Sequence, residues 1–93
     1  MPRQALYVVA YDISEDRERA RVDKILIGFG FRVQKSVFEC RLSKPARQRL
    51  ESRLAKLEIS SGHVLIYRIA TAQRSAAIGA APPPPDAEVA FIL

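Results

Sequence analysis

Asp12 is the residue of this chain whose type and position best suit chemistry. It lies near the end of the segment 6–13 (LYVVAYDI), whose Val, Ile and Tyr residues are typical of a buried strand. Burying a carboxylate without a partner is costly, so something should compensate its charge. Two interpretations remain open at this point: Asp12 accepts backbone N–H groups and caps the following helix, or it binds a divalent cation.

A metal role for Asp12 requires a second copy of the chain, because one carboxylate is too few for an ordinary enzyme site. If the strand packs near a two-fold axis, two Asp12 carboxylates face each other and need a proton or a cation between them. Mg²⁺ fits such a place, since it usually takes one or two carboxylates and completes its shell with water and phosphate oxygens. On this interpretation we expect one Mg²⁺ shared between the two Asp12 residues of a homodimer.

Arginines suited to phosphate oxygens follow Asp12 within a short segment. Residues 16–21 read Asp-Arg-Glu-Arg-Ala-Arg, and a second basic group occupies residues 44–56. The acidic residues of the first segment could pair with its arginines at helical spacing, so a solvated helix face is an equal alternative. The whole chain has 15 Lys and Arg against 10 Asp and Glu, and its net charge of +5 favours a polyanionic partner such as nucleic acid.

The elements that must position these residues begin with a strand and a helix. The strand is the segment 6–13, and Ser14 after it is a candidate N-cap. Apolar residues then recur at helical spacing, and Gly28 and Gly30 mark the end of the helix. The arginines after Asp12 therefore lie on this first helix.

The rest of the domain repeats the pattern after a hairpin. Residues 31–42 are dense in strand-forming residues, and their centre at 34–36 suits a tight reversal. Ser43 and Pro45 begin a second helix, and residues 64–69 (VLIYRI) form a fourth strand. The order β-α-β-β-α-β predicts an α+β, ferredoxin-like fold, in which an antiparallel sheet carries both helices on one face.

The first strand and the tail both indicate a homodimer. The segment 6–13 is apolar on both alternating sides, whereas two helices cover only one face of a sheet, so an identical subunit is the simplest cover for the other. Four prolines at 82–85 form an extended spacer before 88–93 (EVAFIL), which has the composition of a strand. We expect a ferredoxin-like domain over residues 1–80. Residues 81–93 are expected to be a Pro-rich linker and an extra C-terminal strand that docks on a sheet edge of the dimer.

Composition excludes several other classes of protein. No run of about 18 apolar residues and no secretory signal are present, so we expect a cytoplasmic protein without a membrane partner. Cys40 is the single cysteine, which rules out an internal disulfide and favours a core position. His63 has no nucleophile arranged around it in the sequence, so we assign it no role.

The segments 7–42 and 64–69 resemble the CRISPR-associated Cas family two pattern. That family combines a strand ending in Tyr-Asp, an Arg-bearing helix, a helix-terminal Gly and a Gln-x-Ser-Val-Phe hairpin. This chain has Tyr11-Asp12, the pair Arg19 and Arg21, Gly30, and residues 34–38 (QKSVF) at compatible spacing. Residues 70–93 are only generically similar to the family.

The resemblance implies a homodimer that bridges two dimers of a companion CRISPR integrase and supports a double-stranded DNA destined to become a spacer. Some members are similar to metal-dependent endonucleases that act on RNA or DNA. Asp12 would then be the catalytic and Mg²⁺-binding residue. The residues that would lie around the cleft and bind nucleic acid are Tyr11, Arg19, Arg21, Arg32, Ser36 and Phe38. The resemblance leaves open whether the chain is an active nuclease or a scaffold.

Proteins with this topology have other functions as well. An RNA-recognition module shares the topology, but its aromatic-rich motif is missing from the segment VFECRL. A regulatory module that binds a small ligand is disfavoured by the surplus of arginine and by the lack of a glycine-rich loop. A nucleic-acid-binding module without catalysis stays open.

Overall fold

The computed structural model describes residues 3–70 and 76–81. Its elements follow the predicted order and are β1 (Gln4–Ile13), α1 (Asp16–Ile27), β2 (Phe31–Gln34), β3 (Val37–Ser43), α2 (Lys44–Ala55) and β4 (Gly62–Ile69). The strands are rich in β-branched and aromatic residues, and the helices carry apolar residues on one face. The sequence-based boundaries agree with these elements to within about two residues.

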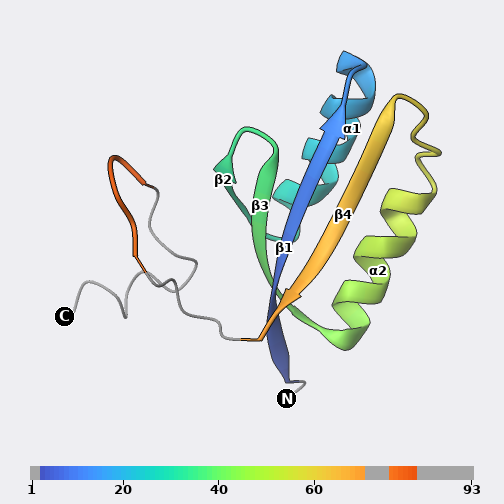
Figure 1. The fold of residues 1–93 in the computed structure, drawn as a ribbon. Helices are drawn as coiled ribbons and strands as arrows, with labels where there is room; N and C mark the ends of the chain where they lie inside the picture. The colour runs from blue at the N-terminus through green and yellow to red at the C-terminus, as the bar shows by residue number, and fades with distance from the viewer. Residues whose placement is uncertain (1–2, 71–75, 82–93) are drawn as a thin grey trace.

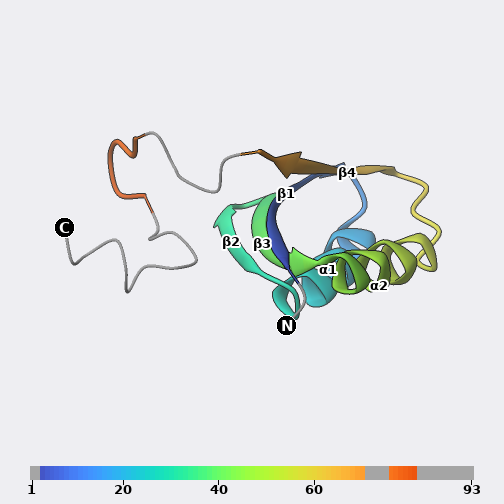
Figure 2. The ribbon, with the colours of Figure 1, turned by 90° about the horizontal axis from the view of Figure 1, so that it is seen from below.

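The four strands form one sheet in the order β2-β3-β1-β4. All neighbouring pairs are antiparallel, with Val9 opposite Phe38 on β3 and Ile66 on β4. Both helices lie on the same face of the sheet (Figures 1 and 2). This arrangement confirms the predicted ferredoxin-like fold.

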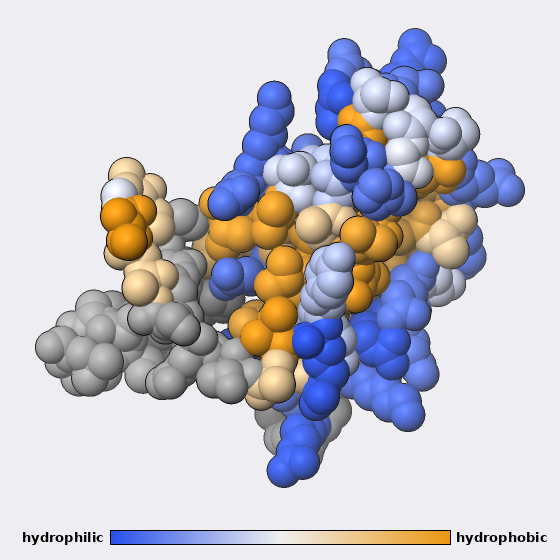
Figure 3. All heavy atoms as spheres, in the orientation of Figure 1, coloured by the Kyte–Doolittle hydropathy of each residue, from blue (hydrophilic) through white to orange (hydrophobic). Residues whose placement is uncertain are grey.

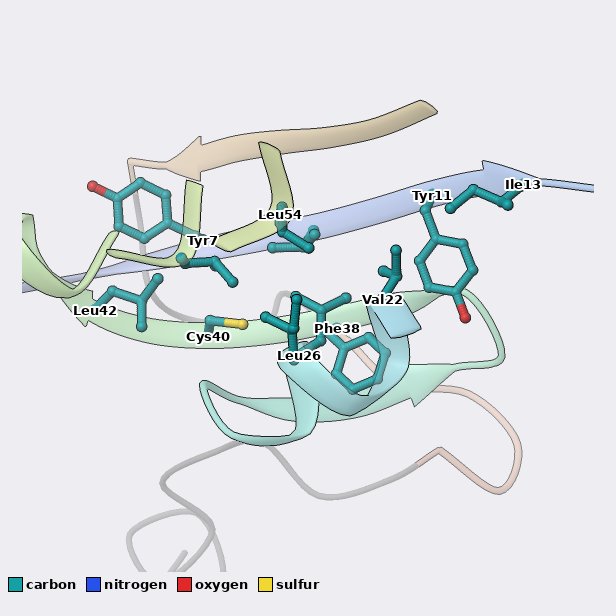
Figure 4. Packing of buried hydrophobic residues seen from close by; sticks show 12 residues of the cluster. Tyr7, Tyr11, Ile13, Val22, Leu26, Phe38, Cys40, Leu42 and Leu54 are labelled. Atoms are coloured by element: carbon teal, nitrogen blue, oxygen red, sulfur yellow. The ribbon is translucent and has the colours of Figure 1, made fainter. Parts of the chain in front are cut away.

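The core fills the space between the sheet and the two helices. The side chains that are fully buried there include Val9, Val22, Leu26, Phe38 and Leu50. Figure 4 shows Val22, Leu26 and Phe38 among the packed side chains. Cys40 is also buried, as predicted, and burial raises the pKa of its thiol to about 11. A protonated, enclosed thiol is inert, so Cys40 acts as a small apolar residue.

The two helix starts differ in how they are capped. At α2, Ser43 Oγ accepts a hydrogen bond from the Ala46 backbone N–H at 3.3 Å, as the sequence predicts. At α1 the prediction is wrong, because Glu15 occupies the N-cap position and makes no side-chain cap. Ser14 instead donates its hydroxyl to the Ser61 carbonyl at 3.1 Å, which ties the start of α1 to the loop before β4.

The sheet face away from the helices carries apolar side chains. By strand alternation, Val8 and Ala10 lie on this open face and are half-buried. Their cross-strand neighbours Tyr67 and Leu65 on β4 are 53% and 44% exposed. Figure 3 shows this apolar surface along the strands. In the described part of one chain, the face predicted to need a cover is still open.

Two further expectations concern the chain ends and membranes. The predicted C-terminal strand at 88–93 and most of the linker 81–93 lie outside the described residues. Among the described helices, none is long and apolar enough to cross a membrane.

Candidate functional site

A hollow of about 340 Å³ lies where β1 ends beside α1 and the β2–β3 turn. Most of the residues singled out from the sequence line it. The lining residues are Tyr11, Asp12, Ile13, Arg19, Asp23, Arg32, Lys35 and Ser36. The fold therefore brings together two acidic residues, two arginines and two hydroxyl-bearing residues from different parts of the segment 11–36.

Asp12 is exposed and lies at the end of the open sheet face. Strand alternation places it on the same side as Val8 and Ala10, whereas Tyr11 and Ile13 point into the core. His63 is its partner across the β1–β4 pair and is also exposed, which puts an imidazole beside the carboxylate. The sequence suggests a carboxylate whose burial must be compensated, but within one chain Asp12 is exposed, so its charge needs no buried partner there.

A glycine lets β4 approach the backbone of Asp12 closely. Gly62 pairs with Ile13, and a Cβ atom built on Gly62 would lie 1.8 Å from the Asp12 carbonyl oxygen. No side chain fits at that distance, so only glycine allows this register. Gly62 thus fixes the backbone that presents Asp12.

Arg19 reaches back from α1 to the end of β1. Its Nη1 donates to the carbonyls of Ile13 at 2.7 Å and Ser14 at 2.9 Å, and it also pairs with Asp16. These two carbonyls directly follow Asp12 in the chain, so the bonds hold the Arg19 guanidinium at the hollow. Its side chain keeps about a third of its surface exposed, so a phosphate can still reach it.

Arg32 and Tyr11 meet at Asp23 of α1. The Tyr11 hydroxyl donates to Asp23 Oδ1, and Arg32 Nη2 lies 3.1 Å from Asp23 Oδ2. Arg32 Nη1 also donates to the Lys35 carbonyl in the β2–β3 turn at 2.8 Å. Burial and the bond to Asp23 raise the pKa of Tyr11 to about 12, so the hydroxyl stays protonated and keeps donating.

Phe38 and Arg21 do not line the hollow. Phe38 is completely buried in the core, and the Arg32 guanidinium lies 5.0 Å from its ring centroid. Within one described chain, Phe38 therefore supports Arg32 from beneath rather than facing solvent. Arg21 is exposed on α1 outside the hollow. Ser36 lines the hollow, and its carbonyl accepts the Tyr11 backbone N–H at 3.0 Å.

Two acidic residues of α1 have structural partners that the sequence did not reveal. Glu18 accepts hydrogen bonds from the hydroxyls and backbone N–H groups of Ser60 and Ser61, at 2.5–3.1 Å. The Ser61 hydroxyl and these N–H groups lower the pKa of Glu18 to about 2. Asp23 lies four residues after Arg19, a spacing that shares one helix face and is the sequence signal that could have placed it in the site.

The residues around Asp12 fit a hydrated divalent cation. Asp23 is already bonded to Tyr11 and Arg32, and no group of three His, Cys, Asp or Glu side chains gathers as ligands within residues 3–70 and 76–81. One chain therefore supplies a single carboxylate, at Asp12. Mg²⁺ accepts such a set when water, phosphate oxygens and a second carboxylate complete its shell.

A larger hollow, of about 530 Å³, lies at the opposite end of β1. Its charged lining residues are Arg3, Lys44, Arg47, Glu51 and Arg68. Its only carboxylate, Glu51, pairs with Arg47 on α2. This hollow is larger, but we do not choose it as the reactive site, because Glu51 is already paired with Arg47 and is not available to hold a cation.

Comparison with known proteins agrees with this geometry. The family model for CRISPR associated protein Cas2 matches residues 5–77. A CRISPR-associated endoribonuclease Cas2 of Chloroflexus aurantiacus is 37% identical over 91 residues, covering 94% of this chain and 98% of the relative. A Mycobacterium tuberculosis relative with the corresponding name is 45% identical over 62 residues. That match covers 67% of this chain and 55% of the relative.

Solved structures of similar chains have the same fold. A hypothetical protein from Thermus thermophilus superposes with a TM-score of 0.77 at 35% identity, covering 87% of this chain and 98% of that one. A chain of a partial Cas6-RT-Cas1–Cas2 complex gives a TM-score of 0.55 at 26% identity, covering 69% of this chain and 77% of that one. Because the family model spans both helices, the Asp12 hollow and all of the described sheet except its first residue, the chain belongs to the CRISPR associated protein Cas2 family.

Proposed function

We propose that this chain acts in CRISPR adaptation as a homodimer that binds a nucleic-acid duplex and cleaves phosphodiester bonds with the help of Mg²⁺. The observation that carries the proposal is the hollow at the end of β1, which joins Asp12 to Arg19 and Arg32. An acidic residue that can hold a cation, at a hollow lined also by two arginines, is suited to a phosphodiester. The names of the relatives support an action on RNA.

The open sheet face supports dimerisation. A monomer would leave Leu65 and Tyr67 in water beside the half-buried Val8 and Ala10, and contiguous apolar surfaces of this kind are typical of interfaces. A second copy related by a two-fold axis presents the same surface to the first. Because Asp12 and His63 lie on this face, the dimer would bring two such pairs toward each other.

The proposed C-terminal strand has an edge on which to dock. β4 is the last strand of the sheet order and pairs only with β1 among the described strands, so its outer backbone groups face no described strand. Residues 88–93, which follow the prolines at 82–85, are apolar enough to add a strand there. We propose that this segment pairs with β4 of the partner subunit and stabilises the dimer.

The residues of the hollow would have different roles toward a phosphodiester. Asp12 from each subunit would hold the cation, and Arg19 and Arg32 would bind and orient the phosphate oxygens. Tyr11 and Ser36 fix the backbone of the β2–β3 turn beside them. The chemistry that Mg²⁺ supplies when bound there is charge neutralisation at the scissile phosphate and acidification of a water molecule.

The proposed partner is a companion CRISPR integrase. One structural neighbour belongs to a complex that contains Cas1 and Cas2. We propose that the homodimer bridges two integrase dimers and supports the DNA duplex between them. Pull-down of the companion integrase with the purified chain tests this, and failure of the two proteins to associate at low salt would contradict it.

Duplex binding is tested by its dependence on salt. Contacts to phosphates release counterions, so log K should fall linearly with log salt, with a slope near −0.9 per contact on B-DNA. Fluorescence anisotropy with DNA and RNA duplexes of two unrelated sequences would measure it. Binding that ignores salt, or that depends strongly on base sequence, would contradict the proposal.

A further inference from the structure

We propose that Asp23 is a positioning residue of this site, which holds the Arg32 guanidinium in the hollow that Asp12 also lines, for contact with a phosphodiester backbone. This role rests on the nucleic-acid binding proposed above and identifies the group that prepares it. Asp23 belongs to α1, whereas the residues that it binds belong to β1 and β2. One carboxylate therefore joins three elements around the hollow.

The two oxygens of Asp23 have different partners. Oδ1 accepts the Tyr11 hydroxyl, which fixes the carboxylate against the end of β1. Oδ2 lies 3.1 Å from Arg32 Nη2, and Arg32 Nη1 donates to the Lys35 carbonyl at 2.8 Å. With the Phe38 ring 5.0 Å beneath it, the guanidinium is held from three directions.

Arg32 still has capacity for a ligand. Its side chain is 39% exposed, and a guanidinium has five N–H donors, of which the bonds to Asp23 and to the Lys35 carbonyl occupy only part. Exposed ion pairs contribute little to folding stability, because solvent screens them. The pair between Asp23 and Arg32 therefore matters more for where the guanidinium lies than for the stability of the fold.

The pair between Asp23 and Arg32 also limits where the Arg32 guanidinium can lie in the hollow. Its lining holds three cationic residues, Arg19, Arg32 and Lys35, around only two carboxylates, Asp12 and Asp23. If Asp23 loses its charge, the flexible Arg32 side chain is no longer tied to α1 and can leave its place in the hollow. Holding a long side chain in its binding geometry also lowers the entropy lost on contact with a ligand.

The sign of the effect separates positioning from simple electrostatics. Removing a negative charge near bound phosphates should tighten binding if charge alone matters. A positioning role predicts the opposite for Asp23→Asn, a loss of duplex affinity of about fivefold or more, within the usual range of coupling between contacting residues. Glu15→Gln is the matched control, because Glu15 is an exposed acid at the start of the same helix with no side-chain cap bond, and it should bind as tightly as wild type or tighter.

A double-mutant cycle tests the proposal. Affinities of wild type, Asp23→Asn, Arg32→Gln and the double variant would be measured by anisotropy with a fluorescein-labelled DNA duplex, with urea midpoints checked for each. If Asp23 acts through Arg32, the double variant binds like Arg32→Gln alone. The salt dependence of each single variant should then be shallower by about one phosphate contact. A merely structural role would lower affinity equally in both backgrounds.

The other outcomes overturn the proposal in distinguishable ways. Tighter binding by Asp23→Asn, or equal losses in both backgrounds, would refute positioning while leaving duplex binding intact. Wild-type affinity in Arg32→Gln would also refute the role of Asp23. No duplex binding by wild type at low salt would overturn the proposed function itself.

Discussion

Replacing Gly62 with alanine should disturb the end of β1 that presents Asp12. The new Cβ would lie 1.8 Å from the Asp12 carbonyl oxygen, 2.8 Å from its carbonyl carbon and 2.8 Å from Ile13 Cα. Ordinary carbon–oxygen contacts are about 3.3 Å or longer. All three obstructing atoms are backbone, so no rotamer change relieves the contact, and β1 and β4 must separate by on the order of 1 Å at this point.

The expected cost follows from that displacement. Overpacking of this kind typically lowers the free energy of unfolding by about 1–3 kcal/mol. For a domain of this size each kcal/mol lowers Tm by about 4–8 °C, so a fall of roughly 5–20 °C is expected. A misplacement of about 1 Å can also reduce a catalysed rate on the order of 100-fold.

Gly28→Ala is the matched control. Gly28 has φ −77° at the end of α1, and its added Cβ would meet only the Ile25 carbonyl oxygen, at 3.4 Å. Alanine there should be neutral or should stabilise the fold by up to about 1 kcal/mol. Urea and thermal denaturation followed by circular dichroism would measure both variants. A Gly62→Ala variant with the wild-type midpoint would refute the close approach of β4 to Asp12.

Three further results are expected. Because the hydrogen bonds from Ser61 and Ser60 lower the pKa of Glu18 to about 2 from 4.5, their stabilisation is present above pH 4.5 and is lost as the pH falls toward 2. As the pH falls from 4.5 toward 2, the free energy of unfolding measured with urea should therefore decrease less for Glu18→Gln than for wild type. The same decrease in both proteins would contradict this linkage. Phe38→Leu should lower the free energy of unfolding by about 1 kcal/mol and a change near zero would argue against its complete burial. Deleting residues 86–93 should raise the dissociation constant of the dimer in analytical ultracentrifugation, and an unchanged constant would exclude a docking role for this segment.

The fold could be predicted from the sequence because its local signals agree. Ser43 and Pro45 begin α2 where capping preferences place them, and the turn after Gln34 ends β2 as its polar residues indicate. The predicted cap at Ser14 was wrong because its hydroxyl can bond either to the helix N-terminus or to the Ser61 carbonyl. Only the folded chain brings that carbonyl near. A cap is predictable only where no distant group competes for it.

The candidate site was predictable in part for the same reason. Asp12 and Arg19 are close in sequence, so a strand followed by a helix already places them together. Asp23 and Arg32 meet only through the packing of α1 against β2, and the spacing of Asp23 four residues after Arg19 indicates a shared helix face but not this partner. For Phe38 the resemblance predicted a place around the cleft. Strand alternation instead buries its side chain in the core beneath Arg32.

Cleavage by wild type and Asp12→Asn tests the central proposal most directly. The substitution preserves size and hydrogen bonding but removes both negative charges from the proposed shared cation site. With Mg²⁺, the wild-type dimer should cut labelled RNA or DNA under single-turnover conditions, and EDTA should abolish the reaction. Asp12→Asn should still dimerise and bind duplex but should not cut. Wild-type cleavage rates in Asp12→Asn, or undiminished cleavage in EDTA, would contradict the role of the Asp12 pair.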